Sequence, residues 1–484
     1  MYLIRTPLAA AVALAFAVSA HAGNTTTVNQ NGTNNFTATS QDTSDASSIT
    51  VNQNGDSNHV GYQYNAWWES GSPTVVQPGA MQSGTTNGTV TIGQSGQSNW
   101  GWAQQVGSNQ VTANVQQNGS FNGGSIYQVS TQNTASNVIQ NGFGNGGSIS
   151  QWSVNNTGMQ FALTYGDSNT INQSGSNNGA FIGQWNTLNS GASIHQSGTA
   201  NQGTISQSNQ FASSQNQVNS AEVLQSGAFN SGFVTQAGNV GTLATLQQGV
   251  SGQSNGYSSG DSAQIEQFGN TNAAAYALQN GDNSYVSVAQ NGNTYATATV
   301  WQRAGNNNNG QVEQDNTTAA SAFVAQFGDS LSAKVTQDKG SAFVTAFVNQ
   351  GGSGDTVNVT QSNASFSSAT VNQGDAWGQS VDTNSDATIT QKNGSFLTAS
   401  ITQYGDQQSG TINQEGNFLT ASVYQSGVLN VALVTQAGSN NGATVTQFGT
   451  GTTANNALVS QSNSNYVATV AQNGAGNIAN VQQH

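Results

Sequence analysis

The sequence predicts an all-β fold, a β-solenoid of stacked strand-turn-strand repeats, with about twenty rungs of 22–23 residues. Two observations predict it. The motif Ala-x-Val/Ile-x-Gln-x-Gly recurs along the chain in steps of mostly 11 or 12 residues. Only 5% of the 484 residues are charged, while 58 are glycine. This composition is too polar for a thick core and too poor in charge and proline for a disordered chain, so a thin core repeated many times is expected.

Each motif predicts one β-strand followed by a turn. In residues 399–405, 421–427, 432–438 and 443–449, Ala, Val/Ile and Gln alternate with other residues, which is the period of a strand with one buried face. Glycine two residues after the motif glutamine and asparagine three residues further on tolerate positive φ, so we expect both where the chain reverses. The turn residues named on this basis are Gly427, Asn430, Gly438, Asn441, Gly474 and Asn477.

Stacking of the repeats brings equivalent side chains into register. Strands of neighbouring rungs lie about 4.8 Å apart, so Ala and Val/Ile form apolar columns. The inward glutamines can form ladders, in which each amide donates to the next rung and accepts from the previous one. The glutamines predicted to form these ladders are Gln30, Gln94, Gln117, Gln140, Gln173, Gln196, Gln225, Gln403, Gln414, Gln425, Gln436, Gln447, Gln472 and Gln483.

A longer pattern, Gln-x-Gly-x-x-Asn-x5-Gln, carries a family resemblance. It begins at Gln30, Gln94, Gln117, Gln140, Gln173, Gln196, Gln225, Gln425, Gln436 and Gln472. With these residues the chain closely resembles curlin, the repeat protein of bacterial curli fibres, from Gln30 to Gln483. The resemblance implies export through an outer-membrane curli pore, templating by a nucleator subunit, and assembly into cross-β fibres of the biofilm matrix.

The first 22 residues are predicted to be a secretory signal peptide, and residues 23–484 the curlin-repeat solenoid. Arg5 precedes an apolar run from Leu8 to Val18, and Ala20-His21-Ala22 has the form of a cleavage site. The run is shorter than the roughly 20 residues that span a bilayer. We therefore expect export through the periplasm of a Gram-negative bacterium to an extracellular, cell-surface fibre.

The repeat is interrupted at residues 64–81, where an irregular insertion is expected. Pro73 and Pro78 lie there, and proline cannot donate to a sheet ladder. Trp67 and Trp68 lie in the same stretch, so a recognition element is the alternative to a plain insertion. The last motif runs to Gln483 without a segment to cover it, so we expect open edges that recruit further copies of the chain.

Other classes of function are disfavoured. Once Arg5 is removed with the signal, only four basic residues remain against 19 acidic ones, which argues against binding to nucleic acid or to an anionic membrane surface. His59, His195 and His484 are far apart and lack the spacing of metal ligands. The glycine-rich stretch 142–147 fits a dinucleotide motif by chance, because no strand-to-helix unit surrounds it.

The function predicted from the sequence is therefore structural, with no catalytic, cofactor or metal site. The chain is expected to be a subunit of extracellular amyloid fibres that serve the biofilm matrix, adhesion and surface colonisation. The alternative is a monomeric secreted β-solenoid that acts as an adhesin or ligand-binding rod. A solenoid enzyme that degrades polysaccharides ranks third, because the acidic residues are scattered.

Overall fold

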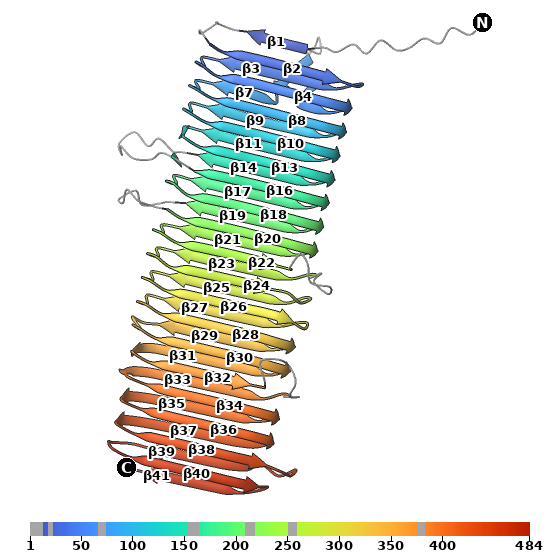
Figure 1. The fold of residues 1–484 in the computed structure, drawn as a ribbon. Coiled ribbons are helices and arrows are strands. Elements are labelled where there is room, and N and C mark those ends of the chain that lie inside the picture. Colours follow the sequence, from blue (N-terminus) through green and yellow to red (C-terminus); the bar gives the residue numbers. More distant parts are fainter. Residues whose placement is uncertain are drawn as a thin grey trace, which may run out of the picture. The chain divides into compact units, whose positions relative to one another are not determined.

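The protein is a β-solenoid of about 18 turns built from two parallel sheets, which confirms the predicted fold class. The computed structural model describes residues 13–17, 23–65, 74–152, 164–165, 167–208, 218–249, 259–374 and 383–484, and none of these is helical. They belong to two compact units, one of residues 1–229 and 235–238 and one of residues 230–234 and 239–484. Figure 1 shows how the strands of the two sheets alternate along the chain within each unit.

In the first unit, each turn of the solenoid contributes one strand to each sheet. Sheet B contains β2 (Thr25–Asn31), β4 (Ser48–Asp56), β8 (Thr89–Gln97), β10 (Thr112–Ser120), β13 (Ala135–Phe143), β16 (Ser168–Ser176), β18 (Gly191–Thr199) and β20 (Ser220–Ala228). Sheet A contains β1 (Ala13–Ala17), β3 (Phe36–Asp42), β5 (His59–Asn65), β7 (Ala80–Ser83), β9 (Trp100–Val106), β11 (Gly123–Val129), β14 (Gly146–Trp152), β17 (Gly179–Trp185) and β19 (Gln202–Ser208). A further strand, β21 (Ser231–Ala237), crosses the division between the units. Two short strands, β12 (Thr131–Gln132) and β15 (Thr164–Tyr165), pair with each other.

The second unit repeats the same arrangement. Sheet B contains β22 (Leu243–Gln248), β24 (Ala274–Gln279), β26 (Thr297–Ala304), β28 (Ser321–Asp329), β30 (Thr345–Ser353), β32 (Ser368–Gln373), β34 (Thr398–Asp406), β36 (Thr420–Val428), β38 (Gly442–Gly449) and β40 (Val467–Gly474). Sheet A contains β23 (Ser262–Phe268), β25 (Tyr285–Asn291), β27 (Asn309–Asp315), β29 (Ser332–Asp338), β31 (Thr356–Ser365), β33 (Asp386–Ser395), β35 (Ser409–Asn417), β37 (Asn430–Ser439), β39 (Asn455–Gln461) and β41 (Ile478–Gln483).

Strands of successive rungs pair in parallel and place like residues opposite each other. Between β10 and β13, Val115 faces Val138 and Gln117 faces Gln140. Val115 and Val138 are completely buried, while Thr112 and Gln116 on the opposite face of β10 are exposed. The core thus contains a single layer of side chains from each sheet, because alternate residues of a strand point to opposite faces.

The number of rungs is slightly below the expected twenty because several repeats carry extra residues. Most inward glutamines bond to a glutamine 22 to 25 positions further on, as Gln117 does at 23 and Gln436 at 25. The step grows to 41 after Gln53 and to 33 after Gln140. The added residues leave the strand register unchanged, so they consume chain length without adding a rung.

The segment 64–81, expected as an irregular insertion, is described in part, and Trp67, Trp68 and Pro73 lie outside the described residues. Its described part contains β6 (Thr74–Pro78), which pairs antiparallel with β5. The chain then returns to sheet A through β7, which pairs with β3 and β9. Of residues 1–22, only β1 is described, and it pairs in parallel with β3.

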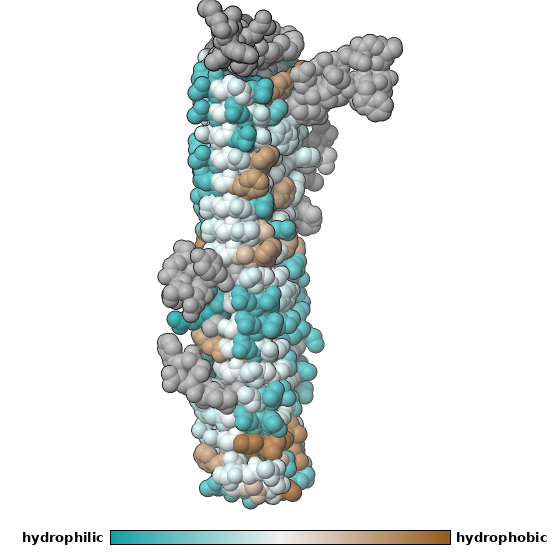
Figure 2. All heavy atoms as spheres, turned by 90° about the vertical axis from the view of Figure 1, so that its right-hand side faces the viewer, coloured by the Kyte–Doolittle hydropathy of each residue, from teal (hydrophilic) through white to brown (hydrophobic). Residues whose placement is uncertain are grey.

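The face of the solenoid seen in Figure 2 is mostly of intermediate or hydrophilic character. Figure 2 views the side on which sheet B strands end, and there the hydrophobic residues form separate patches. Only one ion pair, between Lys334 and Glu313 at 3.7 Å, occurs among the described residues. Because both of its side chains are half exposed, this pair adds little stability. Backbone and side-chain amides therefore account for most of the polar stabilisation.

Candidate assembly site: glutamine ladders and terminal rungs

The inward glutamines of each sheet form a continuous amide ladder within each unit. Gln117 illustrates the pattern: its Nε2 donates to Gln140 Oε1 at 2.9 Å, and its Oε1 accepts from Gln94 Nε2 at 2.9 Å. Its Nε2 also donates to the carbonyl oxygens of Trp100 and Asn122, both at 2.9 Å. The ladder therefore satisfies buried amides that would otherwise be costly to remove from water.

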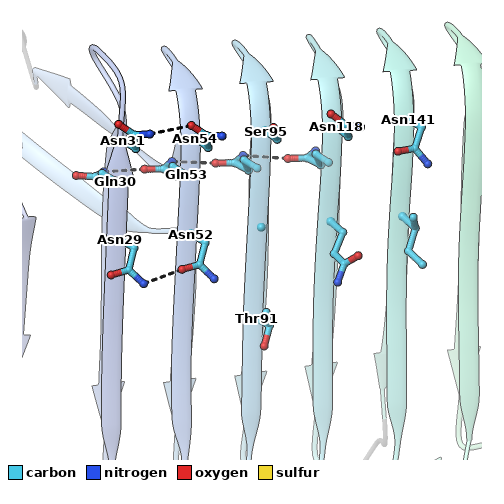
Figure 3. A pocket seen from close by; sticks show the side chains of 15 residues that line it. Asn29, Gln30, Asn31, Asn52, Gln53, Asn54, Thr91, Ser95, Asn118 and Asn141 are labelled. Carbon is cyan, nitrogen blue, oxygen red and sulfur yellow. Dashed lines mark hydrogen bonds between the residues drawn. The ribbon is translucent and has the colours of Figure 1, made fainter.

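The structure places all the glutamines named from the sequence at ladder positions. In sheet B of the first unit these are Gln30, Gln94, Gln117, Gln140, Gln173, Gln196 and Gln225. In the second unit, Gln403, Gln425, Gln447 and Gln472 lie in sheet B, and Gln414, Gln436 and Gln483 lie in sheet A. Figure 3 shows the start of the first ladder, with Gln30 bonded to Gln53.

Other ladder glutamines were not singled out from the sequence. Gln53 links Gln30 to Gln94, and Gln128 links Gln105 to Gln151 in sheet A. The long pattern misses Gln53 because Tyr64 stands where its second glutamine is required, and it misses Gln128 because Ser130 stands where its glycine is required. The shorter signal Val/Ile-x-Gln would have found both, since Val51 and Ile126 precede them by two residues.

The turn glycines have the conformation expected of them. Gly427, Gly438 and Gly474 have φ values of 93°, 100° and 106°. A Cβ atom on Gly427 would also overlap the carbonyl oxygen of Gly449 in the next rung. Positions 427 and 438 therefore require glycine both for backbone conformation and for the close approach of stacked turns, whereas position 474 requires it for backbone conformation alone.

The expectation that the turn asparagines supply positive φ is wrong. Asn430, Asn441 and Asn477 do not have positive φ, which is found instead one residue earlier, at Leu429 (55°), Asn440 (57°) and Gly476 (71°).

The asparagines use their amides to close the turn. Asn441 Nδ2 donates to the carbonyl oxygens of Ala437 and Asn463, at 2.9 and 3.0 Å, and its Oδ1 accepts from the Tyr466 backbone N–H. In the same way, Asn477 Nδ2 donates to Asn455 Oδ1 at 2.9 Å. Asn430, Asn455 and Asn477 form a short second amide ladder, because Asn455 Nδ2 donates to Asn430 Oδ1 and Asn477 Nδ2 to Asn455 Oδ1. Asn441 instead connects its turn to the next one through backbone groups.

The glutamine ladders have one direction. In every described pair, Nε2 of the earlier rung donates to Oε1 of the later rung, as from Gln461 to Gln483 at 2.7 Å. In the last rung, Gln472 and Gln483 Nε2 donate to the backbone carbonyls of Asn456 and Val467. A further rung could therefore continue the ladder by supplying Oε1 acceptors.

The first and last described rungs bury their inward side chains less well than interior rungs do. Val459 and Gln461 of β39 are 0% and 1% exposed, but the equivalent Val481 and Gln483 of β41 are only half-buried. Val28 and Gln30 of β2 are likewise half-buried. Covering these side chains with another rung would remove more apolar surface from water.

Three buried carboxyl groups, those of Asp167, Asp261 and Asp355, occupy inner turn positions among the described residues. Burial raises the pKa of Asp167 to about 7, although the Thr187 hydroxyl and the Ser190 backbone N–H both donate to the carboxyl group. Burial also raises the pKa of Asp355 to about 6, and the Ser385 N–H donates to it. The side chains of Asp167 and Asp355 are therefore at least partly neutral at mildly acidic pH.

The outer face of sheet B carries a shallow groove of about 560 Å³ over β2, β4, β8, β10 and β13. Its lining is rich in amides, with Asn29 bonded to Asn52 at 2.8 Å and Asn31 to Asn54 at 3.2 Å (Figure 3). Gly93 opens the groove because it has no side chain and the space beside it is empty. Such uncharged donors and acceptors could hydrogen-bond a neutral polar ligand.

No group of three or more His, Cys, Asp or Glu side chains that could hold a metal is found in the described part of the chain. His59 lies in β5 and His195 in β18, while His484 follows β41. Within the described ranges, no helix has the length and apolar character needed to cross a membrane.

These features define a class of protein, a parallel β-solenoid whose interior is tied together by amide ladders. The family model described as Curlin associated repeat matches residues 419–449, which contain β36, β37 and β38. The chain therefore carries a curlin repeat, which confirms the resemblance, and its solenoid is consistent with the curlin family. That repeat is structural rather than catalytic. A search of curated proteins finds no match.

Proposed function

We propose that this chain is a structural subunit of extracellular, curli-like amyloid fibres and that it polymerises by stacking rung on rung. The observation that carries the proposal is the directional amide ladder, which reaches the half-buried terminal rungs. The curlin repeat at residues 419–449 supports it independently.

The ladder direction determines how subunits join. The rung of β40 and β41 offers Nε2 donors, and the rung of β2 and β3 offers Gln30 Oε1 as an acceptor. Gln41 Oε1 accepts from the Thr26 hydroxyl and has a second lone pair for a further donor. Joining the last rung of one copy to the first rung of another continues the ladder. Joining two last rungs would instead place Nε2 donors against Nε2 donors. Such a head-to-tail contact does not close on itself and produces a filament.

Assembly can be tested with the purified chain of residues 23–484, diluted from strong denaturant. We expect fibres with strand spacings of about 4.8 Å and sheet spacings of about 10 Å. Fibre fragments should seed further growth. A soluble monomer that persists in the presence of seeds would overturn the proposal.

A pair of variants in one rung tests the stacking contact. Val481→Asp places a charge on the inward side of β41, where an added rung would bury it, so elongation should stop. Val467→Asp is the matched control, because Val467 points outward and is 75% exposed. Equal elongation rates for the two variants would contradict stacking on this rung.

The finer proposals concern export and biological role. Residues 1–22 are proposed to be a secretory signal, so the exported chain should begin at Gly23, which N-terminal sequencing would establish. An outer-membrane curli pore and a nucleator subunit are the proposed partners. The fibre is proposed to serve the biofilm matrix, adhesion and surface colonisation, and deletion of the gene should reduce matrix and surface attachment.

The amide-lined groove on sheet B favours a second candidate function, a monomeric adhesin or ligand-binding rod. Its outward asparagines and glutamines are suited to neutral polysaccharides, because they carry uncharged donors and acceptors. Binding of the monomer to immobilised neutral glycans, without any fibre formation, would favour this function over the fibre.

A further inference from the structure

Four phenylalanines form an exposed ridge in the second unit. Phe343, Phe366, Phe396 and Phe418 lie one residue before the buried turn position that leads into β30, β32, β34 and β36, on the side where sheet A strands end (Figure 1). Their side chains are 54%, 54%, 49% and 58% exposed. Successive ring centroids are 5.0, 5.3 and 5.0 Å apart, with interplanar angles of 4°, 10° and 3°. We call these four residues the phenylalanine ridge.

The backbone at the ridge is strained for phenylalanine. The four φ values are 53°, 50°, 59° and 56°, in the left-handed region that bulky residues avoid. Other rungs place asparagine at the equivalent position, as at Asn272 and Asn440. Asparagine tolerates this conformation better. Ring stacking offsets part of the strain, but about half of each ring surface stays in water, so folding alone does not explain four phenylalanines here.

The chemistry around the ridge indicates what covers it. In the sequence, no charged residue lies within two positions of any of the four phenylalanines, although the chain as a whole has a net charge of −14. Two copies of such an acidic chain repel each other over most of their surface, so an uncharged strip is where they can approach. A cationic partner would instead be drawn to the acidic residues elsewhere.

The spacing of the ridge points to the same occupant. The rings repeat at 5.0–5.3 Å because each belongs to a different rung. A second copy presents rings at the same repeat, so each ring of one ridge can contact an equivalent ring of the other. We propose that the phenylalanine ridge is a lateral contact for the ridge of a second copy of this chain. The contact joins two filaments side by side, and this inference rests on the proposed fibre function.

The size of the ridge decides when the contact forms. A phenylalanine has about 150–250 Å² of surface, so four half-exposed rings present on the order of 400 Å² per copy. Two such ridges bury less than the roughly 1,000 Å² that a specific pair of free proteins needs. Free monomers therefore stay unpaired. In fibres the contact recurs once per subunit and its contributions add.

The experiment compares fibre mass per length, measured by scanning transmission electron microscopy, for three proteins. They are the wild type, a variant with Phe→Asn at all four ridge positions, and a control with Phe→Thr at Phe233, Phe268, Phe347 and Phe448. The control phenylalanines are 38–44% exposed and lie on strands, so both variants lose four exposed rings. We expect the wild type and the control to have twice the mass per length of the ridge variant.

Other outcomes overturn the inference. Lateral pairing would be refuted if the ridge variant had the same mass per length as the wild type, or if the wild type formed single filaments. Either result would leave the fibre function intact. A ridge that only stabilises the solenoid would show a lower melting temperature in the variant with unchanged mass per length. The double variant Phe366→Asn, Phe396→Asn serves if the quadruple variant does not fold, and it should increase the share of single filaments. Absence of wild-type fibres would overturn both proposals.

Discussion

Replacing Gln117 with alanine tests whether the inward ladder stabilises the fold. Gln117 is 2% exposed and bridges Gln94 and Gln140 in the ladder of sheet B. Its neighbour Gln116 in β10 has the same side chain but points to solvent, so Gln116→Ala is a matched control. The two substitutions remove the same atoms from adjacent residues of one strand.

The expected cost follows from the hydrogen bonds that are lost. Without Gln117, Gln140 Oε1 loses its ladder donor and Gln94 Nε2 loses one of its two acceptors, keeping the carbonyl oxygen of His59. Each buried polar group left unsatisfied costs about 1–3 kcal/mol, so Gln117→Ala should cost about 2–6 kcal/mol. Gln116→Ala should change stability by no more than about 0.5 kcal/mol.

A local assay suits this prediction, because rungs of a solenoid contact only their neighbours and open locally. Hydrogen exchange of the amides in β8, β10 and β13 should speed up about 30-fold or more in Gln117→Ala, since 1.4 kcal/mol corresponds to a factor of ten. Exchange in Gln116→Ala should match the wild type. The reasoning is refuted if both variants exchange alike, because the ladder would then add nothing beyond the strand hydrogen bonds.

The remaining predictions concern the buried carboxyl groups and the turn glycines. Because the folded state holds the pKa of Asp167 at about 7, above the ordinary value of 3.8, stability near Asp167 should be highest below about pH 4 and fall as the pH rises to about 7. The loss should approach about 4 kcal/mol, and Asp167→Asn should remove this dependence in hydrogen exchange of β16. Asp355→Asn should remove a smaller dependence, between about pH 4 and 6, in β31. Wild-type protection factors, which compare each exchange rate with the intrinsic rate at the same pH, would contradict both predictions if they did not vary with pH. Gly119→Ala should destabilise β10 by about 1–3 kcal/mol, because φ is 120° and the new Cβ would meet the Gly142 carbonyl oxygen. Gly93→Ala, which faces open space, should have no such cost, and thermal unfolding of both variants would check the contrast.

The sequence by itself determined the repeat and most of the fold. Gln403, Gln414 and Gln425 are 11 residues apart, and each follows Val or Ile by two positions. The strand conformation, the inward-facing side of each strand and the stacking of the repeats therefore all follow from the local sequence period. The glycines at 427 and 438 were also predictable, because positive φ in a tight turn favours glycine strongly.

Only the tertiary structure decided features that depend on which rungs are neighbours. Positive φ falls on Asn440 rather than Asn441, and on the equivalent Phe418 in the preceding rung, so the stacked turns share one backbone conformation whatever residue follows. Phe366 and Phe396 are 30 residues apart in sequence yet stack at 5.3 Å, since the longer repeat between them returns to the same register. Local period specifies each strand, but the hydrogen bonds and side-chain stacking between rungs determine which side chains meet.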